Sequence, residues 1–114
     1  MTTFRRSGSR MDVTGQKALV VGLARSGEAA AELLLKRGAQ VTVTDRRSRE
    51  ALGDVASRLQ HAGAKLVLGE HPEQIFTRSD LIVVSPGVPR TLAPLEAARQ
   101  RGIEIMGELE LAAR

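Results

Sequence analysis

Three short stretches of this sequence have the residue types and spacing to bind a phosphorylated ligand. In the first, Gly22 to Gly27, an apolar run ends in a glycine and a helix-forming segment follows. Gly22 permits a tight turn, and Gly27 lets the first helical turn lie close to the preceding strand. The free amides of Arg25, Ser26 and Gly27 then face outward at a helix N-terminus, which attracts anions. This stretch predicts a phosphate-binding turn.

The turn departs from the dinucleotide-binding pattern G-x-G-x-x-G at its middle position, which is Ala24. An alanine there keeps the backbone further from a pyrophosphate than a glycine does. A turn that needs glycine only for its geometry, and binds nothing, is the alternative interpretation.

The second stretch is Asp45, Arg46 and Arg47, at the end of the second predicted strand. A dinucleotide-binding fold has an acid in this position that hydrogen-bonds a ribose or a base. We therefore predict a binding role for Asp45, whereas Arg49 fits a solvated charge at the start of a helix.

The third stretch, Ser85 to Val88, follows a wholly apolar segment. Pro86 and Pro89 enclose Gly87 and favour a stiff, extended loop whose backbone is open to a ligand. Ser85 lies in Ser-Pro-Gly and not in G-x-S-x-G, so a hydrolase nucleophile is not indicated.

Alternating strands and helices must position these stretches. The pattern predicts an α/β, Rossmann-like, doubly wound five-stranded parallel sheet of order 3-2-1-4-5, with helices on both faces. In this arrangement the three stretches meet at the carboxyl ends of the strands. The predicted strands are 17–22, 40–44, 65–69, 80–84 and 103–106, and the predicted helices are 25–37, 49–61, 73–76, 94–101 and 108–113.

Composition limits the function classes. The 114 residues fit one domain; they include no cysteine, which excludes disulfides and thiol chemistry, and no apolar run of membrane-spanning length. The net charge is +4, but three of the 17 basic residues lie in the acid-free first ten, which leaves 14 basic and 13 acidic groups. We expect a disordered basic leader at 1–10, a domain at 11–114, and no binding to nucleic acid or membrane.

Other residues that can do chemistry have plainer interpretations. His61 and His71 lie beside helix ends or turns, where surface or capping roles are expected. Glu108 and Glu110 suit the first turn of a helix. The sequence therefore predicts no metal site and no catalytic residue.

Four stretches in register, Gly22 to Gly27, Asp45 to Arg47, Ser85 to Val88 and Gly107 to Leu111, resemble the N-terminal domain of the MurD family of Mur ligases. The resemblance covers about 13–114. It implies a domain that binds the UDP part of UDP-N-acetylmuramoyl-L-alanine in a cytoplasmic ligase of peptidoglycan synthesis, which adds D-glutamate and serves cell shape and division.

By this resemblance, Gly22, Arg25, Ser26 and Gly27 face the diphosphate, and Asp45, Arg46 and Arg47 hold the uracil end. Ser85, Gly87 and Val88 line the other side of the base. Arg25 and Arg46 depart from the family pattern, in which these positions are commonly uncharged.

The ligase chemistry implied by the resemblance uses ATP and Mg²⁺, and the phosphate loop that binds ATP, G-x-x-x-x-G-K-[ST], does not occur in the chain. We therefore expect the ATP-binding and C-terminal domains of the family to be missing and the chain alone to be inactive. Two other classes stay open: an NAD(P)- or flavin-binding domain of an oxidoreductase, and a non-catalytic regulatory or partner-binding domain.

Overall fold

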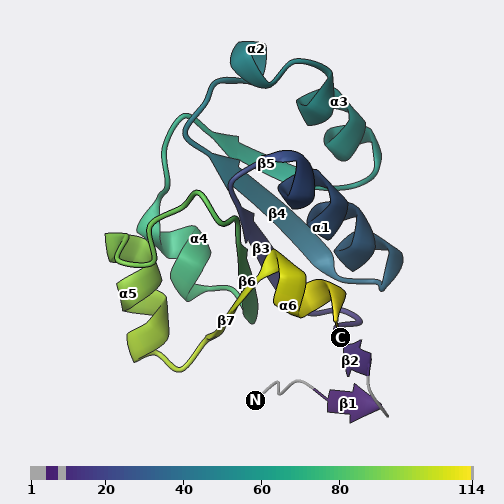
Figure 1. Ribbon diagram of the computed structural model, residues 1–114, viewed down its shortest axis with the longest axis vertical. Helices are drawn as coiled ribbons and strands as arrows, with labels where there is room; N and C mark the ends of the chain where they lie inside the picture. The colour runs from purple at the N-terminus through teal and green to yellow at the C-terminus, as the bar shows by residue number, and fades with distance from the viewer. Residues whose placement is uncertain (1–4, 8–9, 114) are drawn as a thin grey trace.

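A computed structural model describes the backbone of residues 5–7 and 10–113 and the side chains of residues 12–24 and 27–113. Within these residues, one parallel sheet of five strands forms the centre of the molecule (Figure 1). Its order is β5-β4-β3-β6-β7, which is the predicted order 3-2-1-4-5. The fold prediction is therefore confirmed. The strands are β3 (Lys17–Val21), β4 (Gln40–Asp45), β5 (Lys65–Leu68), β6 (Leu81–Val84) and β7 (Glu104–Gly107).

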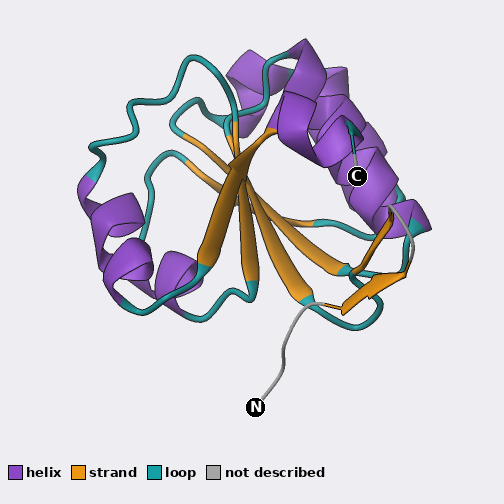
Figure 2. Ribbon diagram, turned by 60° about the horizontal axis from the view of Figure 1, so that its bottom comes forward, coloured by secondary structure: helices purple, strands orange, loops and turns teal. Residues whose placement is uncertain are grey.

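Helices cover both faces of this sheet (Figure 2). One layer contains α1 (Arg25–Lys36), α3 (Asp54–His61) and α6 (Glu108–Ala112), and the other contains α4 (Glu73–Thr77) and α5 (Ala93–Gln100). A helix on each face is the consequence of right-handed crossovers that run in opposite directions from β3.

Strand β3 contributes side chains to two hydrophobic cores, one on each face of the sheet. Ala18 and Val20 pack in the α1 layer, whereas Leu19 and Val21 pack in the α4 and α5 layer. Side chains of a strand alternate between faces, so a continuous apolar run serves a sheet that is covered on both sides. Burial of each such Leu or Val contributes about 1.5 to 3 kcal/mol.

The single helix predicted for 49–61 is wrong, because the structure has two. The first is α2 (Arg49–Leu52), and α3 begins after Gly53. Gly53 has a φ of 64°, a left-handed conformation that ends the first helix. The Ser48 hydroxyl accepts a hydrogen bond from the Ala51 amide and so caps α2.

The predicted basic leader, residues 1–10, lies partly outside the described residues. In the part that the structure describes, β1 (Arg5–Ser7) pairs antiparallel with β2 (Arg10–Asp12), apart from the main sheet. None of the helices that the structure describes has both the length and the apolar character needed to cross a bilayer.

Candidate functional site

The glycine turn between β3 and α1 is as compact as its sequence predicts. Gly22 has a φ of 92°, and a Cβ at this residue would lie 2.9 Å from the Ser85 Cβ. A Cβ at Gly27 would lie 2.2 Å from the Gly22 carbonyl oxygen, so the first turn of α1 approaches the end of β3 too closely for any side chain. Both glycines are therefore required by the geometry of the turn.

Asp45, at the end of β4, holds this turn in place. Its Oδ2 accepts hydrogen bonds from the Leu23 amide, at 2.7 Å, and from the Arg47 guanidinium, at 2.9 Å. Its Oδ1 accepts from the Arg47 amide, at 2.8 Å, and from Arg47 Nε, at 3.0 Å. Arg47 also donates to the Leu23 carbonyl oxygen, at 3.0 Å. These bonds connect the ends of β3 and β4 directly.

The same bonds set the charge of Asp45, which is only 5% exposed. Burial opposes ionisation, but the Arg47 side chain, the Arg47 and Leu23 amides and the Arg47 charge outweigh it and lower the pKa of Asp45 to about 2. Asp45 is therefore an anion throughout the physiological pH range.

The loop after β6 forms the next wall of the site. The Ser85 amide donates to the Val21 carbonyl oxygen, and the Val88 amide donates back to the Ser85 carbonyl oxygen, at 3.1 Å. This loop is a turn, which differs from the extended conformation predicted for it. The Ser85 side chain is buried and donates to Glu108 Oε2, at 3.2 Å.

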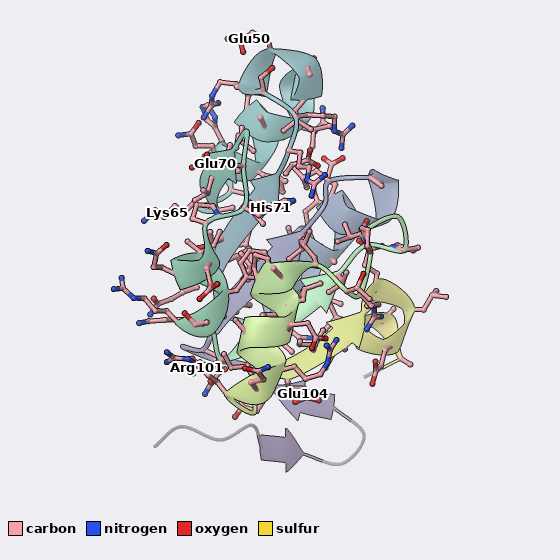
Figure 3. The ribbon with its side chains drawn as sticks, turned by 90° about the vertical axis from the view of Figure 1, so that its left-hand side faces the viewer. Glu50, Lys65, Glu70, His71, Arg101 and Glu104 are labelled. Atoms are coloured by element: carbon pink, nitrogen blue, oxygen red, sulfur yellow. The ribbon has the colours of Figure 1, made fainter. Side chains whose placement is uncertain are left out.

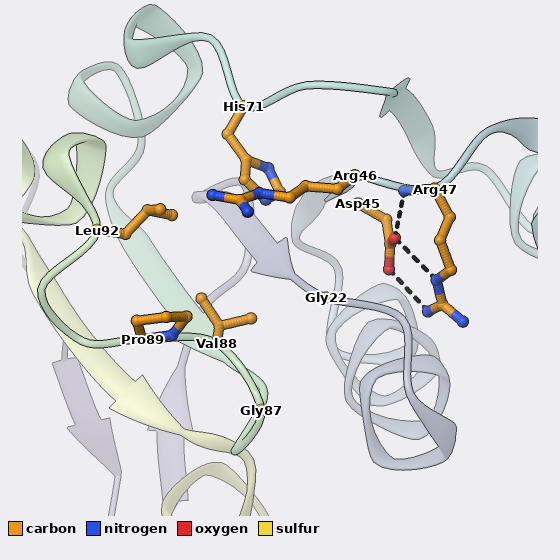
Figure 4. A pocket seen from close by; sticks show the side chains of 9 residues that line it. All are labelled: Gly22, Asp45, Arg46, Arg47, His71, Gly87, Val88, Pro89 and Leu92. Carbon is orange, nitrogen blue, oxygen red and sulfur yellow. Dashed lines mark hydrogen bonds and ion pairs between the residues drawn. The ribbon is translucent and has the colours of Figure 1, made fainter.

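An open groove of about 270 Å³ lies where these loops meet, at the carboxyl ends of β3, β4 and β6 (Figure 4). Six of the ten predicted site residues line it. Ser85 and Gly27 do not, because Ser85 turns toward Glu108 and Gly27 packs on Gly22. The lining residues are Gly22, Asp45, Arg46, Arg47, His71, Gly87, Val88, Pro89 and Leu92.

Arg25 and Ser26 begin α1, so their amides lie at its N-terminus as predicted, but their side chains lie outside the described residues. The prediction of a free amide at Gly27 is wrong, because this amide donates to the Ala24 carbonyl oxygen, at 2.8 Å, and closes the first turn of α1. His61 is exposed, and its Nδ1 lies 3.0 Å from the Ser57 carbonyl oxygen. Among the residues that the structure describes, no three His, Asp or Glu side chains gather in a way that could hold a metal ion.

Sequence reasoning missed three residues of the groove: His71, Pro89 and Leu92. His71 is half-buried, and Figure 3 shows it nearer the middle of the molecule than its neighbour Glu70. It follows β5 by three residues, and this position at the carboxyl end of a strand was the available signal. Pro89 was predicted only to stiffen the loop after β6, and no pattern in the sequence indicates Leu92.

The fold and the groove at the strand ends define the chain as a Rossmann-like domain. The family described as "Mur ligase MurD-like, N-terminal domain" matches residues 16–107. The chain belongs to this family.

A relative in Desulfosudis oleivorans, "UDP-N-acetylmuramoylalanine--D-glutamate ligase", is 52% identical over 104 residues, which cover 91% of this chain and 23% of that protein. The chain thus spans about a quarter of the length of the curated relatives it matches. The solved structure of a pseudomurein peptide ligase type C from Methanothermus fervidus has a TM-score of 0.69 at 25% identity, over 86% of this chain and 20% of that one.

An imine reductase from Myxococcus stipitatus in complex with NADP+ shares the fold, with a TM-score of 0.56 at 22% identity over 80% of this chain and 39% of that one.

Proposed function

We propose that this chain binds the uridine diphosphate part of UDP-N-acetylmuramoyl-L-alanine in the groove at the carboxyl ends of β3, β4 and β6. The observation that carries the proposal is the convergence of three separate loops on one groove. Gly22, the Asp45 to Arg47 segment and the Gly87 to Val88 segment come from different strands and line the same hollow. Its size suits a nucleotide base with its ribose, and its polar groups lie on one side.

The two ends of the ligand are assigned by chemistry. The diphosphate takes the N-terminus of α1, where the amides of Arg25 and Ser26 and the helix dipole favour negative charge. The uracil takes the groove between Arg46 and Val88, with Gly87 at its edge. Asp45 acts through the Leu23 and Arg47 backbone that it holds, and Ser85 acts through the Glu108 side chain, since both side chains bond within the chain.

We propose further that the chain is the N-terminal domain of a cytoplasmic ligase that adds D-glutamate to this substrate in peptidoglycan synthesis. In this proposal the whole ligase consumes ATP and uses Mg²⁺ as its cofactor. The sequence contains no G-x-x-x-x-G-K-[ST], so no catalytic step is assigned to its residues, and the chain alone is expected to be inactive.

Isothermal titration calorimetry with UDP and with NADH tests the proposal. Arg46 is exposed and lines the groove, so Arg46→Ala is expected to weaken UDP binding by roughly tenfold, the cost of one charge-assisted hydrogen bond. Arg49 is also exposed but does not line the groove, and Arg49→Ala is the matched control.

Binding of NADH in preference to UDP would instead support a nicotinamide domain. Binding of neither by a chain that is folded by circular dichroism would favour a regulatory or partner-binding domain.

A further inference from the structure

His71 enters the groove from the loop after β5, and two contacts fix its ring. Its Nδ1 lies 2.9 Å from the Thr44 hydroxyl. Its ring packs edge-on against Phe76, with centroids 6.0 Å apart and an interplanar angle of 81°. In Figure 4 the side chain points from its loop toward the groove, beside Arg46. A ring held on two sides presents its remaining nitrogen in a defined direction.

The contacts of Thr44 determine which ring nitrogen carries the proton. The Thr44 hydroxyl lies 3.1 Å from the Glu70 carbonyl oxygen, which can only accept a hydrogen bond. The hydroxyl has one hydrogen and donates it to that carbonyl, so toward His71 it must accept. Nδ1 of His71 therefore carries the hydrogen, and Nε2 of the neutral ring has a free lone pair. No described residue donates to Nε2.

The ring is also kept neutral. Burial lowers the pKa of His71, the charge of Arg46 lowers it further, and the smaller effect of the Asp45 charge opposes them without reversing the direction. At neutral pH Nε2 is accordingly an acceptor.

Asp45 cannot supply this acceptor. An ionised carboxylate has about four lone-pair sites, and Asp45 already accepts four hydrogen bonds from Leu23 and Arg47. Asp45, which the sequence analysis assigns to the base, thus uses its hydrogen-bonding capacity within the chain. Val88 and Leu92, across the groove, are apolar and offer a surface for the face of a base.

We infer that Nε2 of His71 accepts the imide N–H of uracil, and that this bond makes the groove selective for uracil over cytosine. This inference rests on the proposed function. Uracil carries a hydrogen on N3, whereas cytosine has a lone pair there, which would face the lone pair of Nε2. A buried acceptor that meets another acceptor loses its hydrogen bond and gains nothing in exchange.

Two substitutions of His71 distinguish the role of Nε2 as an acceptor from the contact of Nδ1 with Thr44. In His71→Asn the new side-chain amide nitrogen takes the position of Nδ1, so this variant keeps the bond to Thr44 and removes the acceptor. The longer side chain of His71→Gln reaches the position of Nε2 with its amide oxygen and gives up the bond to Thr44. The pair therefore distinguishes recognition of the base from support of the loop.

Calorimetry with UDP, CDP and the diphosphate of 3-methyluridine measures the effect. We expect the wild-type chain to prefer UDP to either analogue by about tenfold or more, the value of one hydrogen bond in a partly buried site. His71→Asn should bind UDP and CDP about equally, with CDP binding unchanged, and His71→Gln should retain a preference for UDP. A wild-type chain that binds UDP and CDP equally, or a His71→Asn variant that keeps the preference, overturns the inference alone.

Binding of none of the three nucleotides overturns the proposed function and this inference with it. Imidazole ¹⁵N chemical shifts of the wild-type chain give a second measurement that needs no variant. They should show the hydrogen on Nδ1 of His71, and a ring with the hydrogen on Nε2 would contradict the inference.

Discussion

Replacing Asp45 with asparagine tests the account of the glycine turn, because the substitution preserves shape and removes charge. In the wild-type chain the carboxylate accepts two hydrogen bonds from amides and two from the Arg47 side chain. Asparagine keeps one acceptor oxygen and points an NH₂ group at a donor. Asp45→Asn should therefore loosen the connection between the ends of β3 and β4.

The size of the effect follows from the pKa of Asp45, which lies at about 2 in place of 3.8. At about 1.36 kcal/mol for each pKa unit, the difference between these two pKa values corresponds to a contribution of at most about 2.4 kcal/mol to the free energy of unfolding. Because the Arg47 side chain is 51% exposed and water screens its charge, we expect a loss of about 1 to 2 kcal/mol. The folded-state pKa is depressed, so the stabilisation is complete above about pH 4 and disappears as the pH falls toward 2.

Urea denaturation followed by far-ultraviolet circular dichroism, at pH 7 and in steps below pH 4, measures this loss. Asp54→Asn is the matched control, since Asp54 is an exposed acid in the first turn of α3, and it should change the free energy of unfolding by less than about 0.5 kcal/mol. A difference between Asp45→Asn and wild type that stays constant from pH 7 to pH 2 would refute the role assigned to the ionised carboxylate.

Three further substitutions test the packing around the turn. Gly27→Ala should destabilise the fold by about 2 kcal/mol or more, because its Cβ would meet the Gly22 carbonyl oxygen at 2.2 Å. Gly87→Ala is the control and should be nearly neutral, because a Cβ at Gly87 would lie in open space. Equal melting temperatures for the two variants would contradict this expectation. Ser85→Ala should lower the free energy of unfolding by about 1 to 2 kcal/mol, because it removes the hydrogen bond from Ser85 to the buried Glu108 carboxylate. An unchanged midpoint of urea denaturation would show that this bond contributes nothing to stability.

The strand order was predictable from the sequence because two independent signals agreed. Short apolar runs alternate with helical segments, and the run at Leu81–Val84 is apolar on both faces, as a buried parallel strand requires. The topology then fixed which loops meet. Gly22, Asp45 and Gly87 therefore appeared together in the predicted site, although they lie far apart in the chain.

The details of the site were not predictable because they depend on which partner each side chain finds. Nothing local indicates that Asp45 uses all its lone pairs on Leu23 and Arg47, since Leu23 reaches it only through the pairing of β3 with β4. His71 depends similarly on Thr44 of the neighbouring strand. The break at Gly53 was missed because a glycine inside a helical pattern is often tolerated, and only its positive φ shows that the helix ends there.

The position of β3 between β4 and β6 has a consequence for how the molecule folds. β3 and β4 follow one another closely in the chain, but the second neighbour of β3 arrives much later, since Val20 pairs with Val83. Bringing such distant segments together has a higher entropic cost than pairing neighbouring segments, and it slows folding. During synthesis, a nascent chain that ends before β6 exposes one edge of β3 and has only one side of its groove, so ligand affinity should emerge only after β6 and the loop that follows it have been synthesised.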